Sequence, residues 1–137
     1  NKFLVQKRGP SVQTAPGKYE CAAAGHIDVG HTSLETAIKE LEEEAGIAVC
    51  RDDVELVGTI VDQFTMCEGT ILNNEFDDVY LIRKNIIPED LSHHGHEVSS
   101  FHFFDAEEYL SRGRHNDFEL VMRRNEYELL YKHLFGN

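Results

Sequence analysis

The sequence predicts an α/β fold in which a mixed β-sheet lies between helices, an α/β/α sandwich. Runs rich in β-branched and aromatic residues alternate with amphipathic segments, in the order strand, strand, helix, several strands, helix, helix. The 137 residues are the usual size of one domain, and 41% of them are hydrophobic against 28% charged, as in globular proteins. We therefore expect a single domain over residues 1–137.

Short apolar runs bounded by glycine or proline mark the expected strands. Residues 2–8 (KFLVQKR) alternate in polarity, and Gly9-Pro10 and Pro16-Gly17 then bracket a loop before the next apolar run. The expected strands are 2–8, 19–24, 54–66, 77–83 and 99–104. Because the chain begins at Asn1 and enters the first strand at once, we allow for a missing N-terminal strand.

Helix signals are strongest after the loop at residues 25–31. Thr32 can cap a helix, Glu35 completes a capping box three residues later, and Gly46 suits the position after the last turn. The apolar residues between them recur at helical spacing on one face: Leu34, Ala37, Ile38, Leu41 and Ala45. Two further helices are expected, a short one that Asp105 caps and that reaches Leu110, and a longer one over 119–135.

Composition restricts the class of partner and the location. Lys and Arg number 13 against 25 Asp and Glu, and a net charge of −12 disfavours binding to nucleic acid. No run of about 18 apolar residues predicts a membrane span. Three irregularly spaced cysteines without a C-x-x-C pair favour a reducing, cytoplasmic location over a disulfide framework or zinc site. Oligomeric state is left open, with a homodimer among the alternatives.

The most informative stretch is an acidic helical segment. Glu40, Glu43 and Glu44 stand at i, i+3 and i+4, so their carboxylates share one face. Like charges at this spacing cost about 0.2–0.5 kcal/mol, and anions in the last turn oppose the helix dipole. A solvated acidic face is the ordinary interpretation of such a helix. A divalent cation between the carboxylates would reverse each penalty, and Mg²⁺, which takes oxygen ligands, fits best.

Residues 25–47 resemble the signature of the Nudix hydrolases, G-x5-E-x7-R-E-U-x-E-E-x-G-U, where U is a bulky aliphatic residue. Seven of the nine specified positions match: Gly25, Glu40, Leu41, Glu43, Glu44, Gly46 and Ile47. The preceding ECAAAGH is similar to the subgroup that resembles isopentenyl diphosphate isomerase, in which AAGH also opens the motif. The resemblance implies a Nudix-like α/β/α sandwich.

The same resemblance implies a function and a set of site residues. Glu40, Glu43 and Glu44, with the Ala24 carbonyl, would bind Mg²⁺, for which Mn²⁺ could substitute. Glu44, Glu40 or the later Glu97 would activate water for cleavage of a diphosphate linkage in a nucleoside diphosphate derivative or related small molecule. Positive side chains on the first strand are candidate phosphate contacts, namely Lys7 and Arg8, although solubilising strand-end charges are an equal alternative.

Two positions depart from the signature. His31 stands where the family has its first glutamate, and Lys39 where it has an arginine. In the family these two residues form an ion pair between loop and helix, which His31 and Lys39 cannot form with each other. Lys39 can instead pair with Glu35 or Glu43, four residues away. We expect the metal ligands to be intact and their supporting contacts to be altered, which often costs about 10–100-fold in metal affinity or activity.

Two alternatives to a hydrolase stay open at this point. The AAGH segment favours an isomerase acting on isopentenyl diphosphate, although the chain offers no convincing match to the cysteine motif of those enzymes. His31 and Lys39 favour a non-catalytic module that binds a diphosphate compound.

Overall fold

The strands pair into two antiparallel sheets, which helices flank on both sides. The computed structural model describes residues 1–66, 71–92 and 95–136. Its strands are β1 (Lys2–Arg8), β2 (Tyr19–Cys21), β3 (Val54–Met66), β4 (Ile71–Ile82) and β5 (Val98–Asp105). Its helices are α1 (Ser33–Ala45), α2 (Ala106–Arg114) and α3 (Arg124–Phe135), with short 3-10 helices at Arg51–Asp53 and Pro88–Asp90. The expected α/β fold with helices on both sides of the strands is confirmed. The strands form two sheets with antiparallel pairing between the named strands, where one mixed sheet was expected.

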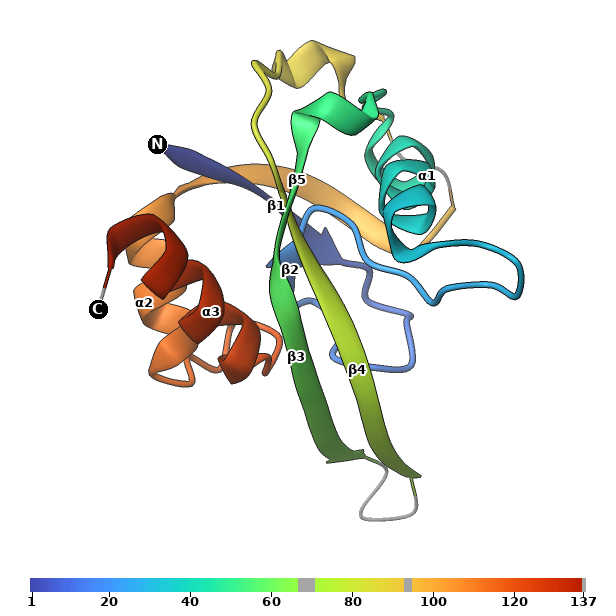
Figure 1. The fold of residues 1–137 in the computed structure, drawn as a ribbon. Coiled ribbons are helices and arrows are strands. Elements are labelled where there is room, and N and C mark those ends of the chain that lie inside the picture. Colours follow the sequence, from blue (N-terminus) through green and yellow to red (C-terminus); the bar gives the residue numbers. More distant parts are fainter. Residues whose placement is uncertain (67–70, 93–94, 137) are drawn as a thin grey trace.

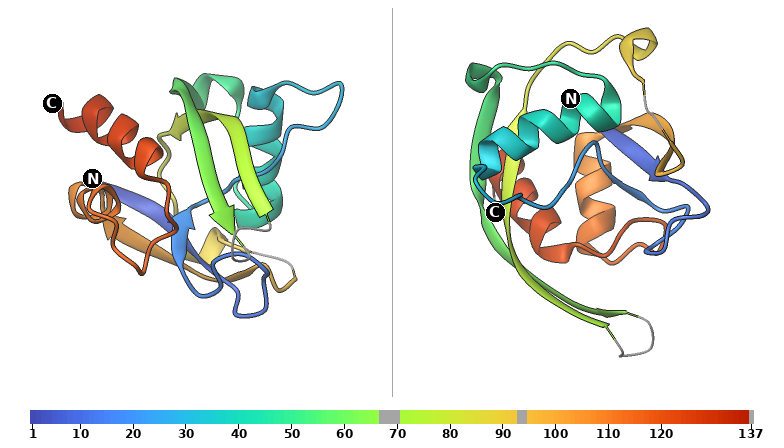
Figure 2. Two further views of the ribbon diagram at one scale, coloured as in Figure 1. Left: turned by 90° about the horizontal axis from the view of Figure 1, so that it is seen from below. Right: turned by 90° about the vertical axis from the view of Figure 1, so that its right-hand side faces the viewer.

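The first sheet has the order β2-β1-β5, and β3 and β4 form the second as one long hairpin. One parallel bridge, between Tyr19 and Leu120, extends the first sheet beyond β2. Helix α1 lies on one side of the strands, and α2 and α3 lie together on the other (Figure 1). The β3–β4 hairpin reaches beyond the helices, as the right-hand view in Figure 2 shows. In the part of the chain that is described, no helix is long and apolar enough to cross a membrane.

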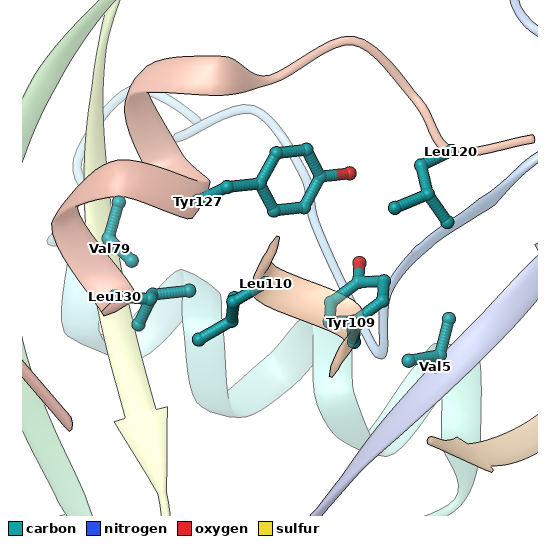
Figure 3. Close-up of a cluster of buried hydrophobic side chains, with 7 residues drawn as sticks. All are labelled: Val5, Val79, Tyr109, Leu110, Leu120, Tyr127 and Leu130. Atoms are coloured by element: carbon teal, nitrogen blue, oxygen red, sulfur yellow. The ribbon is translucent and has the colours of Figure 1, made fainter. Parts of the chain in front are cut away.

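The main hydrophobic core lies between the sheets and the pair α2/α3 (Figure 3). The rings of Tyr109 on α2 and Tyr127 on α3 meet edge to face at 5.6 Å, a favoured aromatic geometry. The buried members of this core are Val5, Val79, Tyr109, Leu110, Leu120, Tyr127 and Leu130. A smaller cluster under α1 consists of the buried residues Leu41, Ala45 and Ile47, and Leu4 and Ala22 are among the partly buried residues packed against it.

Two expected strands have different bounds in the structure. Strand β4 begins at Ile71 and not at residue 77, because it pairs with β3 along almost its whole length, up to the pair Met66 and Ile71. Strand β2 ends at Cys21 and not at residue 24, because the chain turns there towards α1 and the Ala22 carbonyl accepts a hydrogen bond from the Gln6 side chain.

Two expected helices also differ. Helix α2 continues past Leu110 to Arg114, and it passes through Gly113, where a Cβ would overlap the Tyr127 ring. Helix α3 begins at Arg124 and not at residue 119. The segment before it pairs with β2 instead, since the Tyr19 N–H donates to the Glu119 carbonyl and the Val121 N–H to the Tyr19 carbonyl.

Candidate metal and active site

Helix α1 forms where the sequence predicts it, with both end signals in use. The Thr32 hydroxyl accepts from the Glu35 N–H at 3.1 Å, and Gly46 adopts the left-handed conformation at φ 72°. Leu41 and Ala45 bury one face of the helix, together with Ile47 just beyond it. This anchoring directs Glu40 and Glu44 towards the segment that joins β2 to α1, because both contact that segment.

Glu44 is the most enclosed of the three signature glutamates. Its Oε2 accepts a hydrogen bond from the Ala24 N–H at 2.9 Å. Burial raises the pKa of the Glu44 carboxyl from 4.5 to about 7, and the charges of Glu40 and Glu20 add to the rise, while the hydrogen bond from Ala24 and the nearby Gln6 side chain oppose it. A carboxyl with this pKa can exchange a proton near neutral pH.

Glu40 lies against the first glycine of the signature. A Cβ at Gly25 would meet the Cδ, Cγ and Oε1 atoms of Glu40 at 2.6 to 2.9 Å, so only glycine leaves room for this carboxylate as it is placed. Desolvation raises the pKa of Glu40, and the neighbouring charges of Glu43 and Glu97 add to the rise. The signature glutamates therefore do lie within electrostatic reach of each other and of Glu97.

His31 and Lys39, which depart from the signature, contact other acidic residues. The Lys39 ammonium lies 3.9 Å from a carboxylate oxygen of Glu43 and 4.0 Å from one of Asp28, and His31 Nδ1 lies 3.3 Å from Glu35 Oε2. The expected i,i+4 pairing of Lys39 is confirmed for Glu43. The contact with Asp28 joins the loop at residues 25–31 to the helix, which is the connection that the family's own ion pair makes.

Glu97 reaches the neighbourhood of Glu40 through a close backbone contact. The Gly9 N–H donates to the Glu97 carbonyl at 2.9 Å, and a Cβ at Gly9 would overlap the His96 carbonyl. The glycine at the end of β1 thus lets the segment before β5 approach, and this places an exposed carboxylate beside Glu40.

The structure does not bring Lys7 and Arg8 to the glutamates as free cations. Lys7 is paired with Tyr19 across β1 and β2, and its ammonium lies 5.7 Å from the centre of the Tyr19 ring, on the side of the main core. Arg8 donates to Glu20 at 2.6 Å and to the Thr14 carbonyl at 2.8 Å.

Two buried polar residues belong to this region although the sequence pattern did not single them out. Gln6 and Glu20 lie opposite each other on β1 and β2 and are 2% and 3% exposed. Glu20 also lies 3.6 Å from Arg123, and its Oε2 has no hydrogen-bond partner among the described residues. The one available signal was polarity: Gln6 stands two residues after Leu4, at a position of the alternating strand where an inward apolar residue is expected.

The donor chemistry of this cluster fits a hard divalent cation. Carboxylates that raise each other's pKa by proximity are stabilised when a cation lies between them. Within 1–66, 71–92 and 95–136, no three acidic, His or Cys side chains are grouped closely enough to hold a metal ion between them. Mg²⁺ in particular is commonly held by one or two carboxylates and completed by waters and substrate phosphates, so Glu40 and Glu44 at the Ala24–Gly25 backbone suit it.

Comparison with known proteins supports this interpretation of the signature. The family model described as NUDIX domain matches residues 1–124. The chain belongs to the Nudix family. The protein named Nudix hydrolase 3 of Arabidopsis thaliana is 36% identical over 110 residues, which are 79% of this chain and 14% of that protein. An uncharacterized Nudix hydrolase of Clostridium acetobutylicum is 36% identical over 80 residues, 58% of this chain and 37% of that protein.

A solved structure shows the same Nudix fold. The crystal structure of a C. elegans Ap4A hydrolase binary complex superposes with a TM-score of 0.63 at 16% identity, covering 99% of this chain and 88% of that one. At this identity the match concerns the fold. This Nudix chain spans well under half the length of the two curated relatives named above.

Proposed function

We propose that this Nudix protein is a Mg²⁺-dependent hydrolase that cleaves a diphosphate linkage in a nucleoside diphosphate derivative or related small molecule. The observation that carries the proposal is the position of Glu40 and Glu44 against the Ala24–Gly25 backbone at the start of the signature. The hydrolase names of the curated relatives support it. Because the C. elegans neighbour is an Ap4A hydrolase, dinucleoside polyphosphates are a reasonable first substrate to try.

The proposed ligands of the ion are the carboxylates of Glu40, Glu43 and Glu44 and the carbonyl of Ala24. When bound, Mg²⁺ would neutralise phosphate charge and lower the pKa of water. Glu43 is exposed and its pair with Lys39 is a surface contact, so it can turn towards the ion at little cost. Glu44 is fixed from the sheet side by the Ala24 N–H, which leaves its second oxygen free of that bond.

Glu44 is also the preferred acceptor of the proton from the attacking water. Its pKa of about 7 in the metal-free protein lies in the range in which a general base works at neutral pH. Glu40 and the exposed Glu97 are the other two candidates, and Glu97 would act from the segment before β5. Attack of the water oxygen on phosphorus then breaks the bond to the bridging oxygen, which leaves with the other phosphate.

The test is a panel of nucleoside diphosphate derivatives and dinucleoside polyphosphates, assayed with Mg²⁺ and with a chelator. The wild type is expected to release phosphate-containing products only with Mg²⁺, and Glu44→Gln to lose about 100-fold or more of that activity because it cannot take the proton. Equal rates for the two proteins would refute the role of Glu44.

The same panel separates the alternatives. Calorimetric binding without turnover would favour a non-catalytic module and overturn the hydrolase proposal. Proton exchange on isopentenyl diphosphate, measured by deuterium incorporation, would favour the isomerase.

A further inference from the structure

Gln6 is a buried polar side chain in the middle of the first sheet. It is 2% exposed, on the central strand β1, next to the fully buried Val5. An amide taken out of water without partners costs free energy that a strand position of this kind ordinarily avoids by using an apolar residue. The reason for a glutamine here must therefore lie in the polar contacts that it makes.

Those contacts lead to the candidate site. The Gln6 Nε2 donates to the Ala22 carbonyl at 3.1 Å, and the Gln6 side chain lies near enough to Glu44 to lower the pKa of its carboxyl. Because the Ala22 carbonyl can only accept, this bond fixes the orientation of the amide, with Nε2 towards residue 22.

A second hydrogen bond continues from this segment to helix α1. The Ala24 N–H donates to Glu44 Oε2 at 2.9 Å, two residues after the carbonyl that Gln6 holds. Strand β1, the segment at residues 22–24 and the last turn of α1 are thereby joined by two hydrogen bonds, one from Gln6 to Ala22 and one from Ala24 to Glu44. We name this group of Gln6, Ala22, Ala24 and Glu44 the amide clamp.

We propose that Gln6 is a positioning residue, which through the amide clamp fixes the Glu44 carboxylate and the Ala24 backbone in the geometry that receives the divalent cation. The inference rests on the proposed function for the identity of that cation. A buried, hydrogen-bonded partner behind a ligand sets its orientation, and loss of such a partner typically lowers metal affinity by about 10–100-fold. The side chain of Gln6 itself lies behind Glu44 and is not a ligand.

The variant that tests this is Gln6→Met, which keeps nearly the same volume and removes the hydrogen bond to Ala22 and the polar neighbour of Glu44. The matched control is Tyr127→Phe, which removes another buried hydrogen bond, from the Tyr127 hydroxyl to the Val121 carbonyl at 2.7 Å, on the α2/α3 side. Mn²⁺ binding is measured by electron paramagnetic resonance, and amide exchange of Ala24 by NMR in the metal-free protein. Gln6→Met is expected to bind Mn²⁺ about 10–100-fold more weakly and to exchange the Ala24 amide faster, while Tyr127→Phe changes neither.

The wild-type protein gives a second readout if Gln6→Met does not fold. The side-chain amide resonances of Gln6 are expected to shift on Mg²⁺ addition with the same midpoint as the binding itself. Wild-type Mn²⁺ affinity in Gln6→Met, or unmoved Gln6 resonances on Mg²⁺ saturation, would overturn the inference. Failure of the proposed function looks different: the wild type would then bind metal through an intact amide clamp but hydrolyse nothing in the panel.

Discussion

Val5 and Gln6 are neighbours in the sequence, both are buried, and they face opposite sides of the same sheet. Val5 enters the core under α2 and α3, which consists of large apolar and aromatic side chains. Gln6 faces α1, where the buried apolar cluster has three members among the described residues and the charges of Glu20 and Glu40 raise the pKa of Glu44. Hydrophobic burial stabilises a fold, whereas clustered carboxylates destabilise it. We therefore expect burial on the α2/α3 side to compensate for the electrostatic destabilisation on the α1 side.

The largest effect on stability is expected from the α2/α3 side. Leu110→Ala removes a completely buried side chain from the centre of the main core. We expect a loss of about 2–5 kcal/mol in the free energy of unfolding, because the cavity cannot close fully. Urea unfolding measures this loss. Activity per folded molecule should stay near the wild-type value, and a selective loss of activity at unchanged stability would contradict the division between the two sides.

The opposite pattern is expected at Gly25 on the α1 side. Gly25→Ala places a Cβ at 2.6 to 2.9 Å from side-chain atoms of Glu40, so the carboxylate must move. Because Glu40 can swing outward, the free energy of unfolding should change little, while Mg²⁺-dependent activity falls by about 10-fold. Parallel urea unfolding and activity assays decide this, and retention of full activity would show that the placement of Glu40 does not matter.

The pH dependence of stability should reveal how much the buried, charged Glu44 destabilises the metal-free protein. Its pKa is raised by burial from 4.5 to about 7 in the folded protein, so unfolding releases a proton between these values. The stability of the metal-free wild type should therefore fall as pH rises from about 4.5 to about 7. Thermal unfolding in the presence of a chelator measures this. Glu44→Gln should lack this part of the decline, and identical pH profiles for the two proteins would show that Glu44 does not cause it.

The smallest effect is expected from restoring the family's ion pair. The double variant His31→Glu with Lys39→Arg rebuilds the loop–helix pair, but Lys39 already contacts Asp28 across the same gap. Exposed pairs contribute about 0–1 kcal/mol, so Mg²⁺ affinity and activity should rise by about 5-fold at most. A much larger gain in the substrate assay would mean that the Asp28 contact does not replace the original pair.

Capping residues and the polarity pattern of the sequence predicted those helix and strand bounds that depend on neighbouring residues in the chain. Helix α1 begins after Thr32 and ends at Gly46, as the capping residues indicate, and β1 and β3 have the expected bounds. Secondary-structure propensity gave wrong bounds where pairing with a distant strand determines the conformation. The asparagines at 73 and 74 disfavour a strand, yet they pair with β3, and residues 119–121 look helical but bind the edge of β2.

The sequence by itself determined the acidic face of α1, because residue spacing on a helix fixes which side chains are neighbours. Only the tertiary structure determined which segments of the chain the glutamates on that face contact. The contact of Glu40 with Gly25, the approach of Glu97 and the amide clamp around Glu44 each join segments far apart in the chain or across the sheet. Such contacts depend on how strands and helices pack and not on spacing, so Gln6 carried no motif that could reveal its role.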